Sequence, residues 1–212
     1  MLFLIICLLL MSSSSATTYT INKAFFTDDF TENDINAWGP FGASIPNLKL
    51  SSCQSRRLVG GYIWFYVGYN IFVGDTANPS GITRSFSGLI SHFSIRIRAN
   101  LYKLDSWPNN TIFFMVDGVT AYLQTFTASN GGTTDFCGNP SPITNTVNTN
   151  YNDLVVPIDI TVSHTSSTFT LKILSNLIGS SGSWGIRDLH ITMEACDESC
   201  LTCTNLSIYM EM

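Results

Sequence analysis

The sequence predicts an all-β domain made of two antiparallel sheets that pack face to face. From Phe93 to Leu101 apolar and polar residues alternate strictly, which is typical of a strand with one face in water. Thr111–Val116 is apolar on both faces, and the Asp117-Gly118 pair after it favours a tight hairpin into a second alternating run. No segment shows a sustained period of 3.6 residues, so we expect very little helix.

The first sixteen residues are typical of a signal peptide. Met1–Leu10 is apolar and is followed by small polar residues up to Ala16, although the usual positive residues at the N-terminus are missing. About ten apolar residues are too few to span a bilayer, which needs about 20. The alternative is a buried N-terminal strand or helix. We predict cleavage near Thr17 and a secreted or cell-surface protein.

The composition and net charge of the chain limit the kinds of partner that it is expected to bind. Charged residues make up 12% of the chain, aromatic residues another 12%, and the net charge is −5. Lys and Arg form no cluster, which argues against nucleic acid, because phosphate needs a basic face. No later apolar run suggests a transmembrane segment. Residues 17–195 are enough for one β-sandwich domain with a full core.

Three strand signals precede the central hairpin. Phe25–Trp38 opens with a short strand signal and an acidic turn, and its aromatic residues Phe30 and Trp38 are expected in the core. Tyr62–Val73 is apolar on both faces, which favours an inner strand covered on both sides. Thr83–Ile90 is a weaker strand signal that leads into the hairpin.

A long polar segment, Ser129–Asn152, follows the hairpin and consists mainly of Asn, Thr, Gly, Pro and Ser. A compact domain keeps so long a loop for a functional reason, and binding residues tend to lie on such loops. Sugar rings stack on aromatic side chains while amides and hydroxyls bind their hydroxyl groups. We therefore predict a ligand site formed by the loop and nearby aromatics, with Trp107, Tyr151, Asp135 and Asn139 as candidates. For Trp107 the alternative is a plug at the end of the core.

Alternation resumes after the loop in three further runs. Their apolar residues are Ile158, Ile160 and Val162, then Phe169, Leu171 and Ile173, and finally Leu189, Ile191 and Met193. Eight to ten strands at this spacing, without helical interludes, indicate a two-sheet sandwich or jelly roll. The residues expected in its core include Phe93, Ile95, Ile97, Leu101, Ile112, Phe114, Val116 and Trp184.

Several sequence motifs in the chain resemble those of known secreted domains. The opening TDDF with a following Trp, and the closing SWGIRDLHI, resemble the first and last strands of jelly-roll domains of the galactose-binding-like and MAM-like kind. HFSIRIRANLYKLDSWPNNTIFFMVDG, followed by WGIRDLHI and CDESCLTC, resembles ciliate extracellular proteins in which such a sandwich precedes furin-like, growth-factor-receptor-type cysteine repeats. The resemblance covers roughly Phe25–Cys203. It implies that residues 196–212 begin a cysteine-rich repeat that is incomplete here, and it carries no enzyme signature.

The resemblance also raises the question of a structural calcium ion, the only cofactor we consider. In jelly-roll relatives the last strand often reads Trp-x-x-Asp-Asp, and its acids join those of the first strand around Ca²⁺. Here Arg187 replaces the first Asp, which leaves Asp188 and, on the first strand, Asp29 as ligands. A guanidinium beside the site would repel Ca²⁺, which wants several oxygen ligands. The alternative is a structural ion pair of Arg187 or Asp188 across the first and last strands.

Cys53 and Cys137 are expected to form a disulfide, because both lie inside the sandwich region and away from the C-terminal cysteines. Cys7 leaves with the signal peptide. The remaining trio, Cys196, Cys200 and Cys203, has no fourth ligand or following His for a closed zinc site. In a secreted chain the trio is typical of a furin-like repeat, and an odd thiol allows a disulfide to another chain.

Two Asn-x-Ser/Thr sequons, at Asn109 and Asn205, are candidate glycosylation sites. Asn109 lies in the turn of the central hairpin, where a glycan would be exposed.

The sequence offers few candidate catalytic residues. The three histidines, His92, His164 and His190, show no triad or metal-ligand spacing. The loop carboxylates Asp105, Asp117, Asp135 and Asp153 are more simply turn residues than a glycosidase pair. We predict a non-catalytic extracellular recognition module for carbohydrate or a surface protein. The alternatives are a structural or adhesive component of a cell-surface coat and, third, a glycan-active hydrolase.

Overall fold

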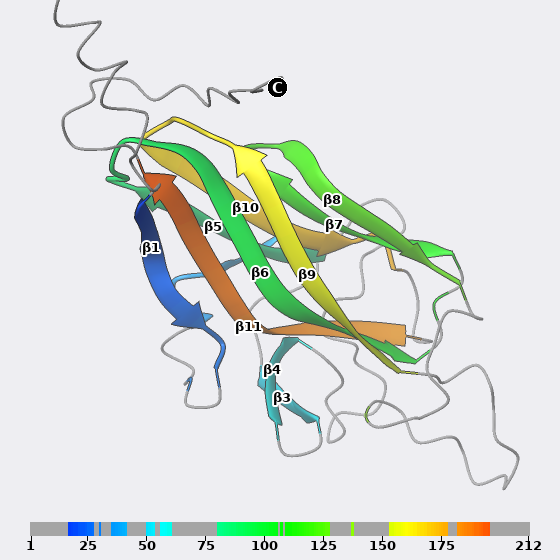
Figure 1. Ribbon diagram of the computed structural model, residues 1–212. Coiled ribbons are helices and arrows are strands. Elements are labelled where there is room, and N and C mark those ends of the chain that lie inside the picture. The colour runs from blue at the N-terminus through cyan, green and yellow to red at the C-terminus, as the bar shows by residue number, and fades with distance from the viewer. Residues whose placement is uncertain are drawn as a thin grey trace, which may run out of the picture.

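The computed structural model describes residues 17–27, 30, 35–41, 50–53, 56–60, 80–105, 107, 109–127, 137, 153–177 and 182–195. This part of the chain is all-β, as predicted (Figure 1). Its strands are β1 (Thr17–Phe25), β2 (Gly39–Phe41), β3 (Leu50–Cys53), β4 (Arg56–Gly60), β5 (Ser80–Ser87), β6 (His92–Asp105), β7 (Asn110–Val116), β8 (Val119–Phe126), β9 (Leu154–Ser163), β10 (Thr168–Ser175) and β11 (Gly182–Ala195).

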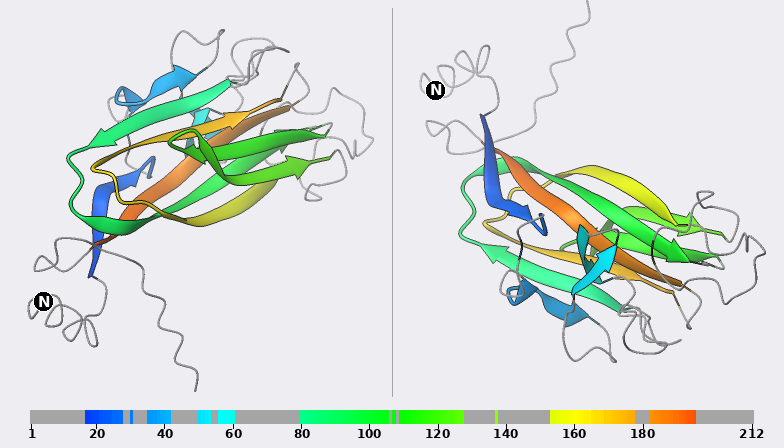
Figure 2. Two further views of the ribbon diagram at one scale, coloured as in Figure 1. Left: turned by 90° about the horizontal axis from the view of Figure 1, so that it is seen from above. Right: turned by 90° about the horizontal axis from the view of Figure 1, so that it is seen from below.

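The strands form two antiparallel sheets, which confirms the predicted sandwich. Sheet A has the order β3-β4-β11-β6-β9, with β1 also paired to β11, and sheet B has the order β2-β5-β10-β7-β8. Two strands pair with the same edge of the long strand β11: β1 pairs with its C-terminal part, and β4 pairs with its N-terminal part. The two sheets lie face to face in both views of Figure 2.

The period-two pattern places one face of each strand in the core between the sheets. Ile95, Ile97 and Leu101 of β6 are fully buried against sheet B, and Ile112 and Phe114 of β7 face them. Full burial of such a side chain stabilises the fold by about 1.5–3 kcal/mol. Val116 and Trp184 are also buried, as expected. Phe93 is only partly buried, because it is the second residue of β6 and lies where the sandwich ends.

The two ends of the sandwich differ. At one end, called here the turn end, short connections join β5 to β6, β7 to β8 and β9 to β10. The β7–β8 turn has positive φ at both central residues, 51° at Asp117 and 81° at Gly118, which is the hairpin geometry that the Asp-Gly pair predicts. At the opposite end, called here the loop end, β4, β8 and β10 end and β5, β9 and β11 begin (Figure 2).

Strand β6 continues four residues beyond the predicted Leu101 because the outer face of sheet A is covered there. Tyr102 and Leu104 point away from the main core but are buried, and they form a second apolar cluster with Cys53 and Leu58. The β3–β4 hairpin supplies this cover. The alternation of polar and apolar residues therefore ends where the strand no longer has a wet face.

Phe30 and Trp38 are buried, as predicted, in an aromatic cluster beside β5. The guanidinium of Arg84 lies over the rings of Phe25 and Phe86, at 4.8 and 5.0 Å from their centroids. This cation–π contact explains how a charged side chain lies on the inward side of a strand. The predicted strand 62–73 lies outside the described residues.

In the described part of the chain, no helix is both long and apolar enough to cross a bilayer.

Candidate functional site

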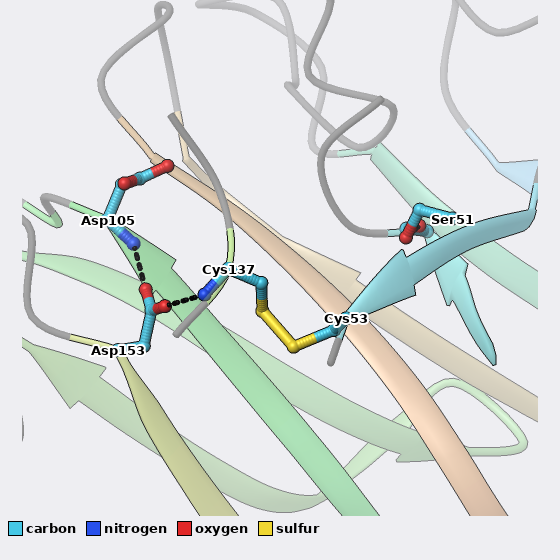
Figure 3. Close-up of a disulfide and its surroundings, with 6 residues drawn as sticks. Ser51, Cys53, Asp105, Cys137 and Asp153 are labelled. Atoms are coloured by element: carbon cyan, nitrogen blue, oxygen red, sulfur yellow. Dashed lines mark hydrogen bonds between the residues drawn. A yellow bond between two sulfur atoms is a disulfide. The ribbon is translucent and has the colours of Figure 1, made fainter. Parts of the chain in front are cut away.

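The loop end is fastened by the predicted disulfide. Cys53, the last residue of β3, is bonded to Cys137, which belongs to the segment between β8 and β9, with a Cα–Cα distance of 5.3 Å (Figure 3). Cys53 is buried in the second apolar cluster, and Cys137 packs against that cluster. The bond therefore ties Cys137 to the outer side of sheet A.

A buried carboxylate fastens the same segment a second time. Asp153 comes directly before β9, and its Oδ1 accepts a hydrogen bond from the backbone N–H of Asp105 at 2.9 Å. Its Oδ2 accepts one from the backbone N–H of Cys137 at 2.7 Å (Figure 3). Bonds from N–H groups to a charged carboxylate are among the stronger ones in proteins. Asp153 thus joins the end of β6, the start of β9 and the disulfide.

The base of the loop end also contains a buried positive charge. Lys103 is only 1% exposed, and burial lowers its pKa, while the negative charges of Asp153 and Asp105 oppose that shift. Asp105 is buried as well. Opposite charges that neutralise one another are the usual way to keep ionisable groups out of water. Asp105 and Asp153 therefore help to anchor the loop end, a role that their sequence context, typical of turn residues, does not predict.

Trp107 belongs to the core and not to a ligand site, which corrects its place among the predicted ligand residues. Its side chain is fully buried, and its ring packs edge-on against Phe126 with centroids 5.3 Å apart. The indole N–H donates to the carbonyl oxygens of Leu104 and Ser183, at 3.2 and 3.1 Å. A fully buried ring with a satisfied N–H has no surface left for a sugar, so the core alternative holds.

Arg187 and Asp188, the last-strand residues of the predicted calcium motif, form an ion pair with each other. Arg187 is buried, and its Nε donates to Asp188 Oδ2 at 2.8 Å. Asn100 Nδ2 donates to the same oxygen at 2.9 Å. Burial raises the pKa of Asp188, but the bonds from Arg187 and Asn100 and the nearby positive charges outweigh it and leave the pKa lowered.

These described residues do not fit Ca²⁺. A guanidinium and an amide N–H already bind the oxygen that a cation would need, and no group of three or more His, Cys, Asp or Glu in the described residues is arranged to hold a metal ion. This ion pair joins neighbours on β11, whereas the expected pair across the first and last strands involves Asp29, which lies outside the described residues. Asp188 has a φ of 52° at an irregularity in the β11–β6 pairing, which brings its carboxylate back to Arg187.

Several predicted site residues lie outside the described residues, so they stay predictions. These are Tyr151, Asp135 and Asn139 of the ligand set, Asp29 of the calcium pair, the cysteines Cys196, Cys200 and Cys203, and the sequon residue Asn205. Asn109 is described and is exposed.

The structure brings His92 and His164 together at the turn end. His92 and His164 hydrogen-bond to each other, to the carbonyl of Ile90 and to the carboxylate of Asp117. Within the described residues neither ring bonds to a serine, threonine or cysteine side chain, which a triad would require.

No family model matches the chain, and no curated protein matches it at a significant level. Solved structures with a similar fold include TmCBM27, a carbohydrate-binding module studied for mannan recognition, with a TM-score of 0.44 and 8% identity over 84% of this chain and 99% of that one. The xylan-binding CBM22-1 domain of Paenibacillus barcinonensis Xyn10C gives a TM-score of 0.41 and 10% identity, covering 87% and 100%. The K2 cleaved adhesin domain of Lys-gingipain gives 0.42 and 12%, covering 84% and 97%. At these identities and scores the likeness assigns no function to this chain.

Proposed function

We propose that the protein is a non-catalytic extracellular recognition module that binds a carbohydrate with the segment 129–152 at its loop end. The observation that carries the proposal is the double anchor at Cys137, which is bonded covalently to Cys53 and by its N–H to the buried Asp153. A loop fixed to a rigid framework before binding loses less conformational entropy when it binds. Recognition benefits from such an arrangement, whereas catalysis would also need reactive groups.

The chemistry of the segment supports carbohydrate as the ligand class. It is rich in Asn, Thr and Ser, whose amides and hydroxyls match sugar hydroxyl groups. With Trp107 in the core, Tyr151 is the aromatic candidate for stacking, and Asp135 and Asn139 are the polar candidates. A surface protein as ligand and a purely structural role in a cell-surface coat are the competing functions.

The Tyr151→Ala variant is expected to weaken binding to the best glycan by about tenfold, which corresponds to about 1.4 kcal/mol. The reason is the loss of the stacking ring, so Tyr151→Phe should keep most of the affinity. A glycan array would find the ligand, and calorimetric titration would measure both variants beside the wild type. The thermal midpoint should stay nearly unchanged in both variants.

The same experiment separates the competing functions. If the wild type binds no glycan on the array, the carbohydrate proposal is wrong. Disulfide-linked oligomers on a non-reducing gel would then favour the coat component, with Cys196, Cys200 or Cys203 as the bridging residues. If Tyr151→Ala binds as well as the wild type, the ligand is right but the site is misplaced.

We further propose that the protein is exported and glycosylated at Asn109. A structural disulfide is typical of proteins from oxidising compartments. Asn109 is exposed, whereas the next residues of its sequon are engaged: Asn110 Nδ2 donates to Asn176 O at 2.9 Å, and the hydroxyls of Thr111 and Thr125 are 2.7 Å apart. Asn109, the acceptor residue of the sequon, is thus accessible to solvent.

Glycosylation at Asn109 predicts a shift in gel mobility when protein from a secretory host is treated with an N-glycosidase. Asn109→Gln should abolish that glycan, and Thr111→Ser should keep it, because serine preserves both the sequon and the hydroxyl. Asn205→Gln tests the second sequon separately. An Asn109→Gln protein that still shows the full shift would place all glycan elsewhere.

A further inference from the structure

A chain of three hydrogen bonds crosses the turn end and joins the two sheets. His92 begins β6 of sheet A, His164 follows β9, and Asp117 lies in the β7–β8 turn of sheet B. His92 Nε2 is 2.7 Å from His164 Nδ1, and His164 Nε2 is 3.0 Å from Asp117 Oδ2. His92 Nδ1 is 2.7 Å from the carbonyl oxygen of Ile90. The other carboxylate oxygen, Asp117 Oδ1, accepts from the N–H of Thr170 at 2.7 Å.

The two imidazoles are held out of water. His92 is 1% exposed, and the side chain of His164 is 7% exposed. Their ring planes are nearly parallel with centroids 5.0 Å apart, and His164 packs edge-on against Phe169. In such a position water does not replace a missing hydrogen bond, so each unsatisfied ring nitrogen costs free energy. Asp117, in contrast, is about half exposed.

The hydrogen-bond geometry sets the number of protons on the rings. The Ile90 carbonyl only accepts, so His92 Nδ1 carries a hydrogen. The contact between the rings needs one more hydrogen. The contact to the ionised Asp117 needs a third, because a carboxylate also only accepts. Two neutral imidazoles carry two ring hydrogens, so the complete chain holds one proton more than that.

We propose that His92, His164 and Asp117 form a pH-sensitive clamp that joins the two sheets while it holds this extra proton. With the proton, the pair of rings carries one positive charge, which the Asp117 carboxylate balances. Without this proton, one of the three contacts has no hydrogen between its two acceptor atoms, so one of the three hydrogen bonds is lost. The clamp is therefore complete while the two rings share one extra proton, and it is loosened when alkali removes that proton.

Charged residues on the neighbouring strands act on the clamp in both directions, and Arg84 of β5 adds a positive charge behind Phe86 and Phe169. On β11, the Glu194 carboxylate accepts a hydrogen bond from the hydroxyl of Ser94, which lies two residues along β6 from His92. Lys172 lies on β10, two residues beyond Thr170. The Glu194 carboxylate favours retention of the proton and the Lys172 ammonium opposes it, so their effects act in opposite directions.

The sign of the pH dependence follows from proton linkage. Imidazoles of an unfolded chain lose their proton at about pH 6.5. A folded state that keeps one proton above this pH binds more protons than the unfolded state, so stability falls as the pH rises. The unfolding equilibrium constant should then increase by up to about tenfold per pH unit above pH 6.5. Urea unfolding at intervals between pH 6 and 8 measures this slope.

The Asp117→Asn variant provides a matched comparison. Its amide oxygen can keep the bond from Thr170 N–H, and its amide N–H can donate to His164 Nε2. The chain then needs only the two ring hydrogens of neutral imidazoles, so stability should no longer fall above pH 6.5. It should instead rise between about pH 6 and 7, where the unfolded imidazoles still bind protons. Asparagine also tolerates the φ of 51° at this position and forms the favoured Asn-Gly turn. His190→Gln, which removes the histidine outside the clamp, should keep the wild-type slope.

A count of protonated ring nitrogens tests the clamp without any variant. Nitrogen NMR of the wild type at pH 6 should show three hydrogen-bearing nitrogens in His92 and His164 together, and Asp117→Asn should show two at pH 8. Two such nitrogens in the wild type at pH 6, or four, would overturn the proposal. Equal slopes for the wild type and Asp117→Asn between pH 6 and 8 would overturn it as well.

Discussion

Replacing Cys53 and Cys137 together by alanine is expected to lower the free energy of unfolding by about 4 kcal/mol. The two cysteines are separated by 84 residues, so their bond removes a large loop-closure entropy from the unfolded chain. Urea unfolding of the wild type and the double variant in the same non-reducing buffer measures the difference. The double variant avoids the free thiol that either single replacement would leave.

A neighbouring residue serves as the control for this experiment. Ser52 is exposed on β3 beside Cys53, so Ser52→Ala should change the stability by less than about 0.5 kcal/mol. The loss in the double variant should also be accompanied by weaker ligand binding, because the anchor at Cys137 would then depend on Asp153 alone. A loss of stability below about 1 kcal/mol would mean that the disulfide does not constrain the unfolded chain.

The Trp107→Ala variant is expected to lose about 3–5 kcal/mol of stability, as removal of a buried aromatic side chain does. The change empties the space beside Phe126 and leaves the carbonyl oxygens of Leu104 and Ser183 without their indole donor. Thermal or urea unfolding gives the magnitude. Ligand affinity of the remaining folded protein should be close to that of the wild type.

Trp107→Phe separates the two contributions to this loss. Phenylalanine keeps an apolar ring near Phe126 but has no N–H, so its cost should be smaller than that of alanine and should reflect mainly the two unbonded carbonyls. If Trp107→Ala is nearly as stable as the wild type but binds glycan poorly, the residue belongs to the ligand site after all and its assignment to the core is wrong.

The parts of the fold that were predictable are those with a local pattern. The alternation in β6 and the Asp117-Gly118 turn depend on residues close in sequence, and the structure places both as expected. The burial of Tyr102 and Leu104 was not predictable in this way, because it depends on the β3–β4 hairpin folding over sheet A. Periodicity identifies a wet face only while nothing distant covers it.

At the two ends of the sandwich, the contacts of the histidines and of Asp153 were not predictable for the same reason. The disulfide could be predicted because few cysteines were left to pair. His92 and His164 are 72 residues apart, and only the strand order brings their rings together. Asp153 has an ordinary sequence context, and its two backbone donors come from residues 48 and 16 positions away. Such pairs follow from topology, which a single sequence does not display.

The pairing of β1 with β11 determines how the domain would respond to mechanical tension. Thr17 pairs with Ala195, so the outer ends of the first and last described strands lie side by side. A force that pulls these two residues apart loads the backbone bonds one pair after another, as in opening a zipper, and β1 should detach first. Its 9 residues would release on the order of 30 Å of chain while the rest of the sandwich and its disulfide stay intact. The domain would thus yield a short extension before it unfolds.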